Sequence, residues 1–203
     1  AAKAREVADE GFAPNVLFAS SMVHLPAFLA LTRDLFADAP VVLYFHENQL
    51  TYPLRDGETR DLTYAYINYL SALAADRVVF NSAFHRDEFF EALPELLRRF
   101  PDYTHLRTAQ RLRDKSRVLH LGLDLAALDA HAGRKRDGNP PIVLWNQRWE
   151  HAKNPEAFFR TMNRLDDAGC RFRLILAGER FEVQPPAFET AFQRYADRIL
   201  HYG

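Results

Sequence analysis

The sequence predicts an α/β protein built on parallel sheets and divided into two units. Short apolar runs rich in β-branched residues alternate with longer stretches in which apolar residues recur at helical spacing. One run, VVLYF at 41–45, is continuously apolar, as expected for a strand buried on both faces of a sheet. The alternation lapses once, near 129–141, and then resumes. These observations predict two sheets separated by a connection.

The first half of the chain predicts four strands joined by helices. The strands are expected at 15–19, 41–45, 77–80 and 117–121. Helices are expected over 24–36, over 58–75 and from Ser82, which is a good cap residue. Pro94 should kink or split the last of these, because proline lacks the N–H that an inner turn requires. Strands that alternate with helices in this way imply a parallel sheet with right-handed crossovers.

The second half predicts a smaller unit of the same kind. Residues 131–141 combine glycines, prolines and charges, which is typical of an exposed connection between domains at 1–130 and 142–203. The elements expected after it are strands at 142–146, 172–178 and 198–203, a helix capped by Asn154 with Pro155 and ended by Gly169, and a helix from about 186. So small a sheet would leave an edge unpaired, so we expect both domains to be incomplete in this chain.

Composition excludes several classes of protein. The chain has 203 residues, of which 48% are hydrophobic, so it can bury a substantial core. A net charge of −1 gives no global sign of nucleic-acid binding, and the basic stretches near 97–101 and 111–117 are interpreted as solvated helix faces. The single cysteine, Cys170, fits a reducing compartment and predicts a cytoplasmic protein. No apolar stretch approaches about 20 residues, so no membrane span is expected.

Polar residues follow the strand at 41–45 as HENQ, residues His46, Glu47, Asn48 and Gln49. The first two letters open the zinc pattern H-E-x-x-H, but the second ligand position is Leu50, which argues against a local zinc site. Ligands of open α/β sheets bind at the carboxyl ends of strands, which favours a binding role. The alternative is a loop whose amides hold the backbone in place.

The segment after the strand at 142–146 carries two cations. Arg148 and Lys153 come just before a predicted helix start, where free N–H groups and the helix dipole favour an anion. The alternative is a pair of ordinary surface cations. The sequence lacks the G-x-G-x-x-G and Walker patterns, which argues against NAD enzymes and P-loop NTPases.

Three stretches, VVLYFHENQLTYP, VVFNSAFHRDEF and WNQRWEHAKNPEAFF, resemble the tRNA-queuosine mannosyltransferase family. The resemblance implies a GT-B pair of Rossmann-like domains and a retaining transfer of mannose from GDP-mannose to queuosine in tRNA, without a metal. It also implies a diphosphate held by Arg148 and Lys153. His46 would face the donor sugar, and Glu47 would stabilise positive charge or position the acceptor hydroxyl, with Asn48 and Gln49 holding the acceptor.

Two other functions remain open at this point. A related family-4-type glycosyltransferase acting on a lipid or a small glycan would fit the same residues. A module that binds a sugar nucleotide or tRNA without catalysis would also fit, because the resemblance places the glycine-rich first turn before Ala1 and the acidic donor motif beyond Gly203.

Overall fold

The computed structural model describes residues 1–36, 38–54, 57–130 and 140–203. It contains two compact units, one formed by residues 1–54 and 58–123 and the other chiefly by residues 124–203. Most of the connection expected at 131–141 lies outside the described residues. Each unit contains a parallel sheet, which confirms the α/β class.

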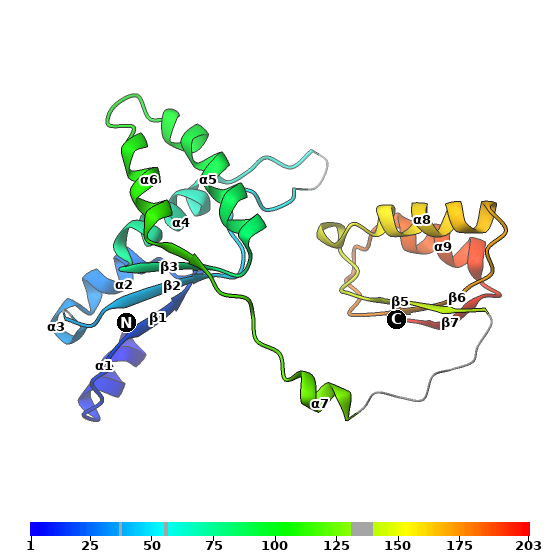
Figure 1. The fold of residues 1–203 in the computed structure, drawn as a ribbon, viewed down its shortest axis with the longest axis horizontal. Coiled ribbons are helices and arrows are strands. Elements are labelled where there is room, and N and C mark those ends of the chain that lie inside the picture. Colours follow the sequence, from blue (N-terminus) through cyan, green and yellow to red (C-terminus); the bar gives the residue numbers. More distant parts are fainter. Residues whose placement is uncertain (37, 55–56, 131–139) are drawn as a thin grey trace. The chain divides into compact units, whose positions relative to one another are not determined.

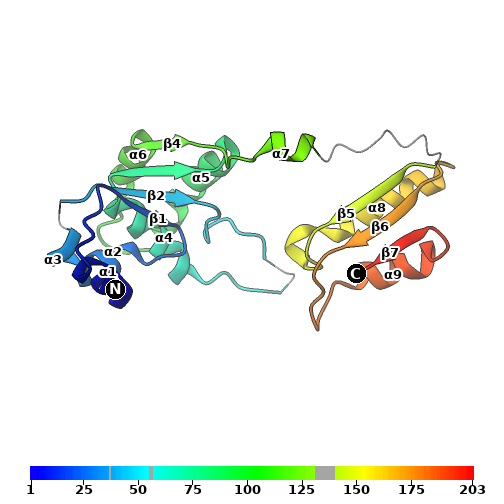
Figure 2. The same ribbon diagram turned by 90° about the horizontal axis from the view of Figure 1, so that it is seen from below.

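The first unit is built on a four-stranded sheet whose order follows the chain. Its strands are β1 (Leu17–Ser20), β2 (Val41–Phe45), β3 (Arg77–Phe80) and β4 (Ser116–Val118). All neighbouring pairs are parallel, and Figure 2 shows β1 and β2 running side by side. Val41, Leu43 and Phe45 point into the core, while Tyr44 is buried on the opposite face of the sheet. The strand at 41–45 is therefore largely covered on both faces, as the sequence predicted.

The helices of the first unit are α1 (Ala2–Asp9), α2 (Leu25–Leu31), α3 (Arg33–Phe36), α4 (Leu62–Ala74), α5 (Ala83–Arg98) and α6 (Leu106–Asp114). Apolar residues of α2, α4, α5 and α6 pack against this sheet, whereas α1 and α3 contain no buried residue. The core joins β2 and β3 to residues such as Leu25 of α2, Tyr69 of α4, Phe89 of α5 and Leu112 of α6.

The helix predicted over 24–36 is divided at Thr32 into α2 and α3. The Thr32 hydroxyl donates to the Phe28 carbonyl at 2.8 Å, while the Thr32 amide turns to the Leu29 carbonyl at 3.3 Å. A Thr side chain can compete in this way for the carbonyl that the helical amide would use. Periodicity alone does not reveal this competition.

Several element ends also differ from the prediction: the strand expected at 15–19 is β1 at Leu17–Ser20, and the helix expected over 58–75 is α4 at Leu62–Ala74. The strand expected at 117–121 ends at Val118, because its partner β3 ends at Phe80, and the Leu119 amide makes the last contact to the Phe80 carbonyl at 2.9 Å. Pro94 lies inside α5 without splitting it. Leu93, Leu96 and Leu97 are buried around it, and their packing favours one continuous helix despite the lost hydrogen bond.

The second unit has a three-stranded parallel sheet in the order β5-β6-β7. Its elements are α7 (Leu125–Asp129), β5 (Ile142–Asn146), a 3-10 turn at His151–Lys153, α8 (Pro155–Asp167), β6 (Arg173–Ala177), α9 (Pro186–Tyr195) and β7 (Ile199–Tyr202). Helices α8 and α9 cover one face of the sheet (Figure 1). As predicted, Asn154 caps α8, accepting from the Ala157 amide at 3.2 Å, and Gly169 follows its last turn with φ +77°.

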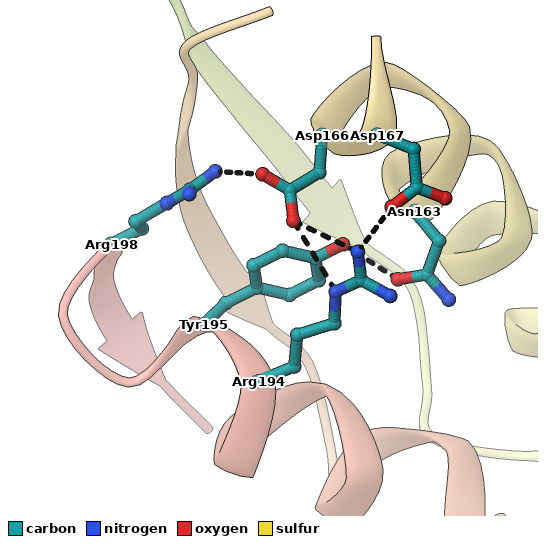
Figure 3. Close-up of polar contacts among 6 residues, drawn as sticks. All are labelled: Asn163, Asp166, Asp167, Arg194, Tyr195 and Arg198. Carbon is teal, nitrogen blue, oxygen red and sulfur yellow. Dashed lines mark hydrogen bonds and ion pairs between the residues drawn. The ribbon is translucent and has the colours of Figure 1, made fainter. Parts of the chain in front are cut away.

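A charged network joins α8 to the end of α9 (Figure 3). Asp166 accepts from Arg194 at 2.9 Å and from Arg198 at 2.7 Å, and Asp167 also accepts from Arg194 at 2.8 Å. Buried Tyr195 donates its hydroxyl to Asn163 at 2.6 Å. Hydrogen bonds from the two guanidinium groups hold the pKa of Asp166 below its usual value.

Candidate functional site

A cavity of about 270 Å³ lies in the first unit at the carboxyl ends of β2 and β3. Three of the four predicted HENQ residues line it, while Gln49 is outside the lining. Open α/β sheets bind ligands at this edge because the loops that follow the strands project polar groups there. The lining residues with polar side chains are His46, Glu47, Asn48, Thr51, Tyr52, Asn81, Ser82, His85 and Glu88.

Asn48 holds the loop after β2 in a tight turn. Its side chain is 4% exposed, and its Oδ1 accepts from the amides of Leu50 at 3.0 Å and Thr51 at 2.9 Å. Its Nδ2 donates to the Thr51 hydroxyl at 2.9 Å, and that hydroxyl lies 3.0 Å from Glu88 Oε2. The side-chain amide of Asn48 therefore holds the backbone of the loop in place, which is the alternative to a binding role that the sequence left open. Its contact with a substrate stays a prediction.

The next residues are held by Asn68 on α4 and by Arg60, which precedes that helix. The Gln49 amide donates to Asn68 Oδ1 on α4 at 2.7 Å, and the Gln49 side chain donates to Glu47 Oε1 at 3.1 Å. Arg60 donates to the carbonyls of Gln49 at 2.9 Å and Tyr52 at 2.8 Å. The loop is thus built as a fixed cavity wall, since both its amides and its carbonyls have protein partners.

His46 is exposed, and its ring packs on the Tyr44 ring with centroids 4.6 Å apart. Its carbonyl accepts from Asn81 Nδ2 at 2.8 Å, which joins the end of β2 to the end of β3. Half-buried Glu47 accepts from the Ser21 hydroxyl through its carbonyl at 2.9 Å. Both side chains reach the cavity from a backbone that is held in place.

His85 and Glu88 were missed by the sequence reasoning. Ser82 caps α5, its hydroxyl accepting from the His85 amide at 3.1 Å, so the first turn of the helix brings His85 over the strand ends. His85 is 8% exposed, and burial lowers the pKa of its imidazole, an effect that the charge of Glu88 partly opposes. The signal that could have found His85 is its position one turn after a predicted cap.

In the second unit, the two predicted cations converge on one carboxylate. Arg148 Nη2 lies 3.0 Å and Lys153 Nζ 3.5 Å from the same oxygen, Glu150 Oε1. That oxygen is buried and, within the described part of the chain, has ion-pair partners but no well-aligned hydrogen bond. The side chain of Arg148 is 52% exposed and that of Lys153 30% exposed, so both cations remain accessible.

The loop that carries these cations lies against the end of β6. The Trp149 amide donates to the Glu179 carbonyl at 2.9 Å, and the buried Trp149 ring stacks on Phe188 with centroids 4.1 Å apart. Gly178 has φ +143°, and a Cβ added there would lie 2.1 Å from the Gln147 carbonyl oxygen. Glycine is required at this position because the two backbones are too close for a side chain.

A second cavity of about 460 Å³ lies beside this loop in the second unit. Glu150, Asn154 and Arg160 are among the residues that line it. Searched over the described residues, the chain has no group of three or more His, Cys, Asp or Glu side chains placed to hold a metal ion. In the same residues, we find no helix with the length and apolarity needed to cross a membrane.

Comparisons with known proteins identify a family. Residues 2–123 match the family model described as tRNA-queuosine alpha-mannosyltransferase N-terminal. A tRNA-queuosine alpha-mannosyltransferase of Drosophila melanogaster is 31% identical over 196 residues, which cover 93% of this chain and 52% of the relative. The chain thus spans about half the length of this curated relative. Because the family model covers more than half of the chain, the chain belongs to the tRNA-queuosine alpha-mannosyltransferase N-terminal family.

Proposed function

We propose that this chain is part of a retaining glycosyltransferase that transfers mannose from GDP-mannose to queuosine in tRNA. The observation that carries the proposal is the match of residues 2–123 to the family. In a GT-B arrangement, residues 1–130 would form the acceptor-side domain, 131–141 the connection and 142–203 the start of the donor-binding domain. Cys170 fits a reducing compartment, and we place the reaction in the cytoplasm.

Arg148 and Lys153 would hold the donor diphosphate. They share Glu150 in the present structure, so two positive charges face one negative charge. The remaining positive charge and the accessible Arg148 guanidinium suit a diphosphate, which forms strong charge-assisted hydrogen bonds with such groups. As the bond between the mannose anomeric carbon and the phosphate oxygen breaks, negative charge grows on GDP. Fixed cations stabilise that charge, so this arrangement requires no metal.

The residues after β2 would act on the sugar and the acceptor. His46 is exposed at the cavity edge and held through its backbone, which suits contact with the donor sugar as positive charge develops at the anomeric carbon. Glu47 would stabilise that charge or position the acceptor hydroxyl. The acceptor oxygen forms the new bond to the anomeric carbon on the face that the phosphate leaves, and its proton passes to the leaving phosphate. Asn48 and Gln49 would support acceptor binding by shaping the loop.

The decisive experiment uses labelled GDP-mannose and the intact protein with two tRNA samples, one containing queuosine and one lacking it. Label is expected only in the queuosine-containing tRNA. Transfer to a lipid or a small glycan, with no difference between the tRNA samples, would instead favour a family-4-type enzyme. Binding of GDP-mannose or of tRNA without any transfer would indicate a non-catalytic module.

A further inference from the structure

The protonation of His85 follows from its neighbour Asn81. The Asn81 amide donates through Nδ2 to the His46 carbonyl at 2.8 Å, so its oxygen is the atom that lies 2.9 Å from His85 Nδ1. Turning the amide around would place its oxygen against the carbonyl oxygen, which pairs two acceptors. An amide oxygen can only accept, so Nδ1 must carry the proton. In the neutral ring, the lone pair is then on Nε2.

Nε2 of His85 is an unpaired acceptor in a buried position. The residue is 92% buried, and Nε2 has no hydrogen-bond partner among the described residues. The ring lies edge-on to Phe80, with centroids 5.2 Å apart, which holds its orientation. Burial also lowers the pKa of the ring, so the lone pair is present at neutral pH. A buried polar atom without a partner costs stability, and such atoms are often explained by a ligand.

The surroundings of His85 define the chemistry of that ligand. Glu47 and Glu88 line the same cavity, and their carboxylates only accept hydrogen bonds. Their negative charge disfavours a phosphate group and favours a molecule that donates hydrogen bonds. A neutral vicinal diol has two hydroxyl donors and no charge. The cavity at the ends of β2 and β3 therefore suits the diol of the acceptor better than the diphosphate of the donor.

We propose that His85 Nε2 accepts a hydrogen bond from a hydroxyl of the acceptor diol bound in this cavity, and that His85 is thereby a specificity-determining residue. This inference rests on the proposed function, because it assigns the acceptor to a particular wall of the site. The Asn81 side chain has a positioning role. Its oxygen sets the tautomer of His85, and its nitrogen holds the carbonyl of His46.

Two variants separate the two ring nitrogens. In His85→Asn, the new amide nitrogen takes the place of Nδ1 and can still donate to Asn81, but the Nε2 acceptor is lost. In His85→Gln, the longer amide places its oxygen near Nε2 and keeps an acceptor there, while the donor to Asn81 is lost. With the intact protein, kcat/KM for queuosine-containing tRNA should fall at least about tenfold in His85→Asn and stay within about threefold in His85→Gln. The affinity for GDP should be unchanged in both.

The reverse order, with His85→Gln impaired and His85→Asn active, would show that the ring acts only through Asn81 and would overturn the proposal. Equal activity of both variants would also overturn it. A second measurement does not depend on how the variants fold. In wild-type protein labelled with 15N-histidine, the unprotonated Nε2 resonance of His85 should move when queuosine nucleoside is added and stay in place with guanosine. An Nε2 chemical shift that does not change when queuosine nucleoside is added would refute the assignment.

These results are distinguishable from a failure of the proposed function. If the wild-type protein transfers no mannose to queuosine-containing tRNA, the proposed function fails, and the nucleoside titration still decides whether His85 accepts from the diol. If the wild-type protein is active and His85→Asn has normal kcat/KM for the tRNA, only the inference about His85 fails.

Discussion

Replacing Gly178 with alanine should destabilise the second unit by about 3 kcal/mol. Two costs contribute. Gly178 has φ +143°, a sparsely populated backbone conformation in which an L-residue is strained by about 1 to 3 kcal/mol. The new Cβ would also lie 2.1 Å from the Gln147 carbonyl oxygen, and backbone must move to relieve this contact, which typically costs about 1 to 3 kcal/mol.

Gly169→Ala is the matched control. Gly169 also has a positive φ, +77°, but nothing lies within 4 Å of a Cβ built there. This variant should therefore show only the first cost, about 1 to 2 kcal/mol. The difference of about 2 kcal/mol between the two variants reports the close approach of Gly178 to Gln147 together with its rarer φ.

Urea unfolding followed by tryptophan fluorescence measures this difference. The chain has two tryptophans, Trp145 and Trp149, and both lie in the second unit, so the signal reports that unit. With an m value near about 1.5 kcal/mol/M, the midpoint of Gly178→Ala should lie about 1.3 M below that of Gly169→Ala. Equal midpoints would refute the reasoning, because they would show that the loop before Arg148 moves aside at no cost.

Three other predictions concern the site and the charged network. In the intact protein, Arg148→Ala and Lys153→Ala should each weaken GDP binding by about 1.5 to 3 kcal/mol and guanosine binding less; equal losses in calorimetry would contradict a phosphate role. His46→Ala should leave GDP affinity within about threefold and lower transfer at saturating donor about a hundredfold. A parallel loss of melting temperature would instead mark His46 as structural. The pKa of Asp166 in the folded protein is lowered chiefly by the hydrogen bond from Arg194. The ionised Asp166 carboxylate therefore stabilises the fold fully above pH 3.8, its usual pKa, and this stabilisation is lost as the pH falls through the lower pKa of the folded state. Asp166→Asn should therefore flatten the acid dependence of the tryptophan-monitored urea midpoint, and an unchanged slope would count against the network.

The sequence by itself determined the class of fold and the ends of several elements. β2 was found at its predicted range because a continuous β-rich run has few alternatives. Ser82 and Asn154 were predicted as caps, and Gly169 as a helix end, because these signals act between residues close in the chain. It also placed His46 and Glu47 at a strand end, where the structure has a cavity. Local chemistry is sufficient for such predictions.

Tertiary structure alone decided which side chains meet. His85 reaches His46 through Asn81, and Glu88 reaches the loop through Thr51, across segments far apart in sequence. Sequence periodicity does not predict these contacts. They depend on the register of neighbouring strands and on the first turn of α5, which together set the distances between the side chains. The same reason explains Gly178, whose need for glycine arises from a neighbouring backbone and not from its own segment.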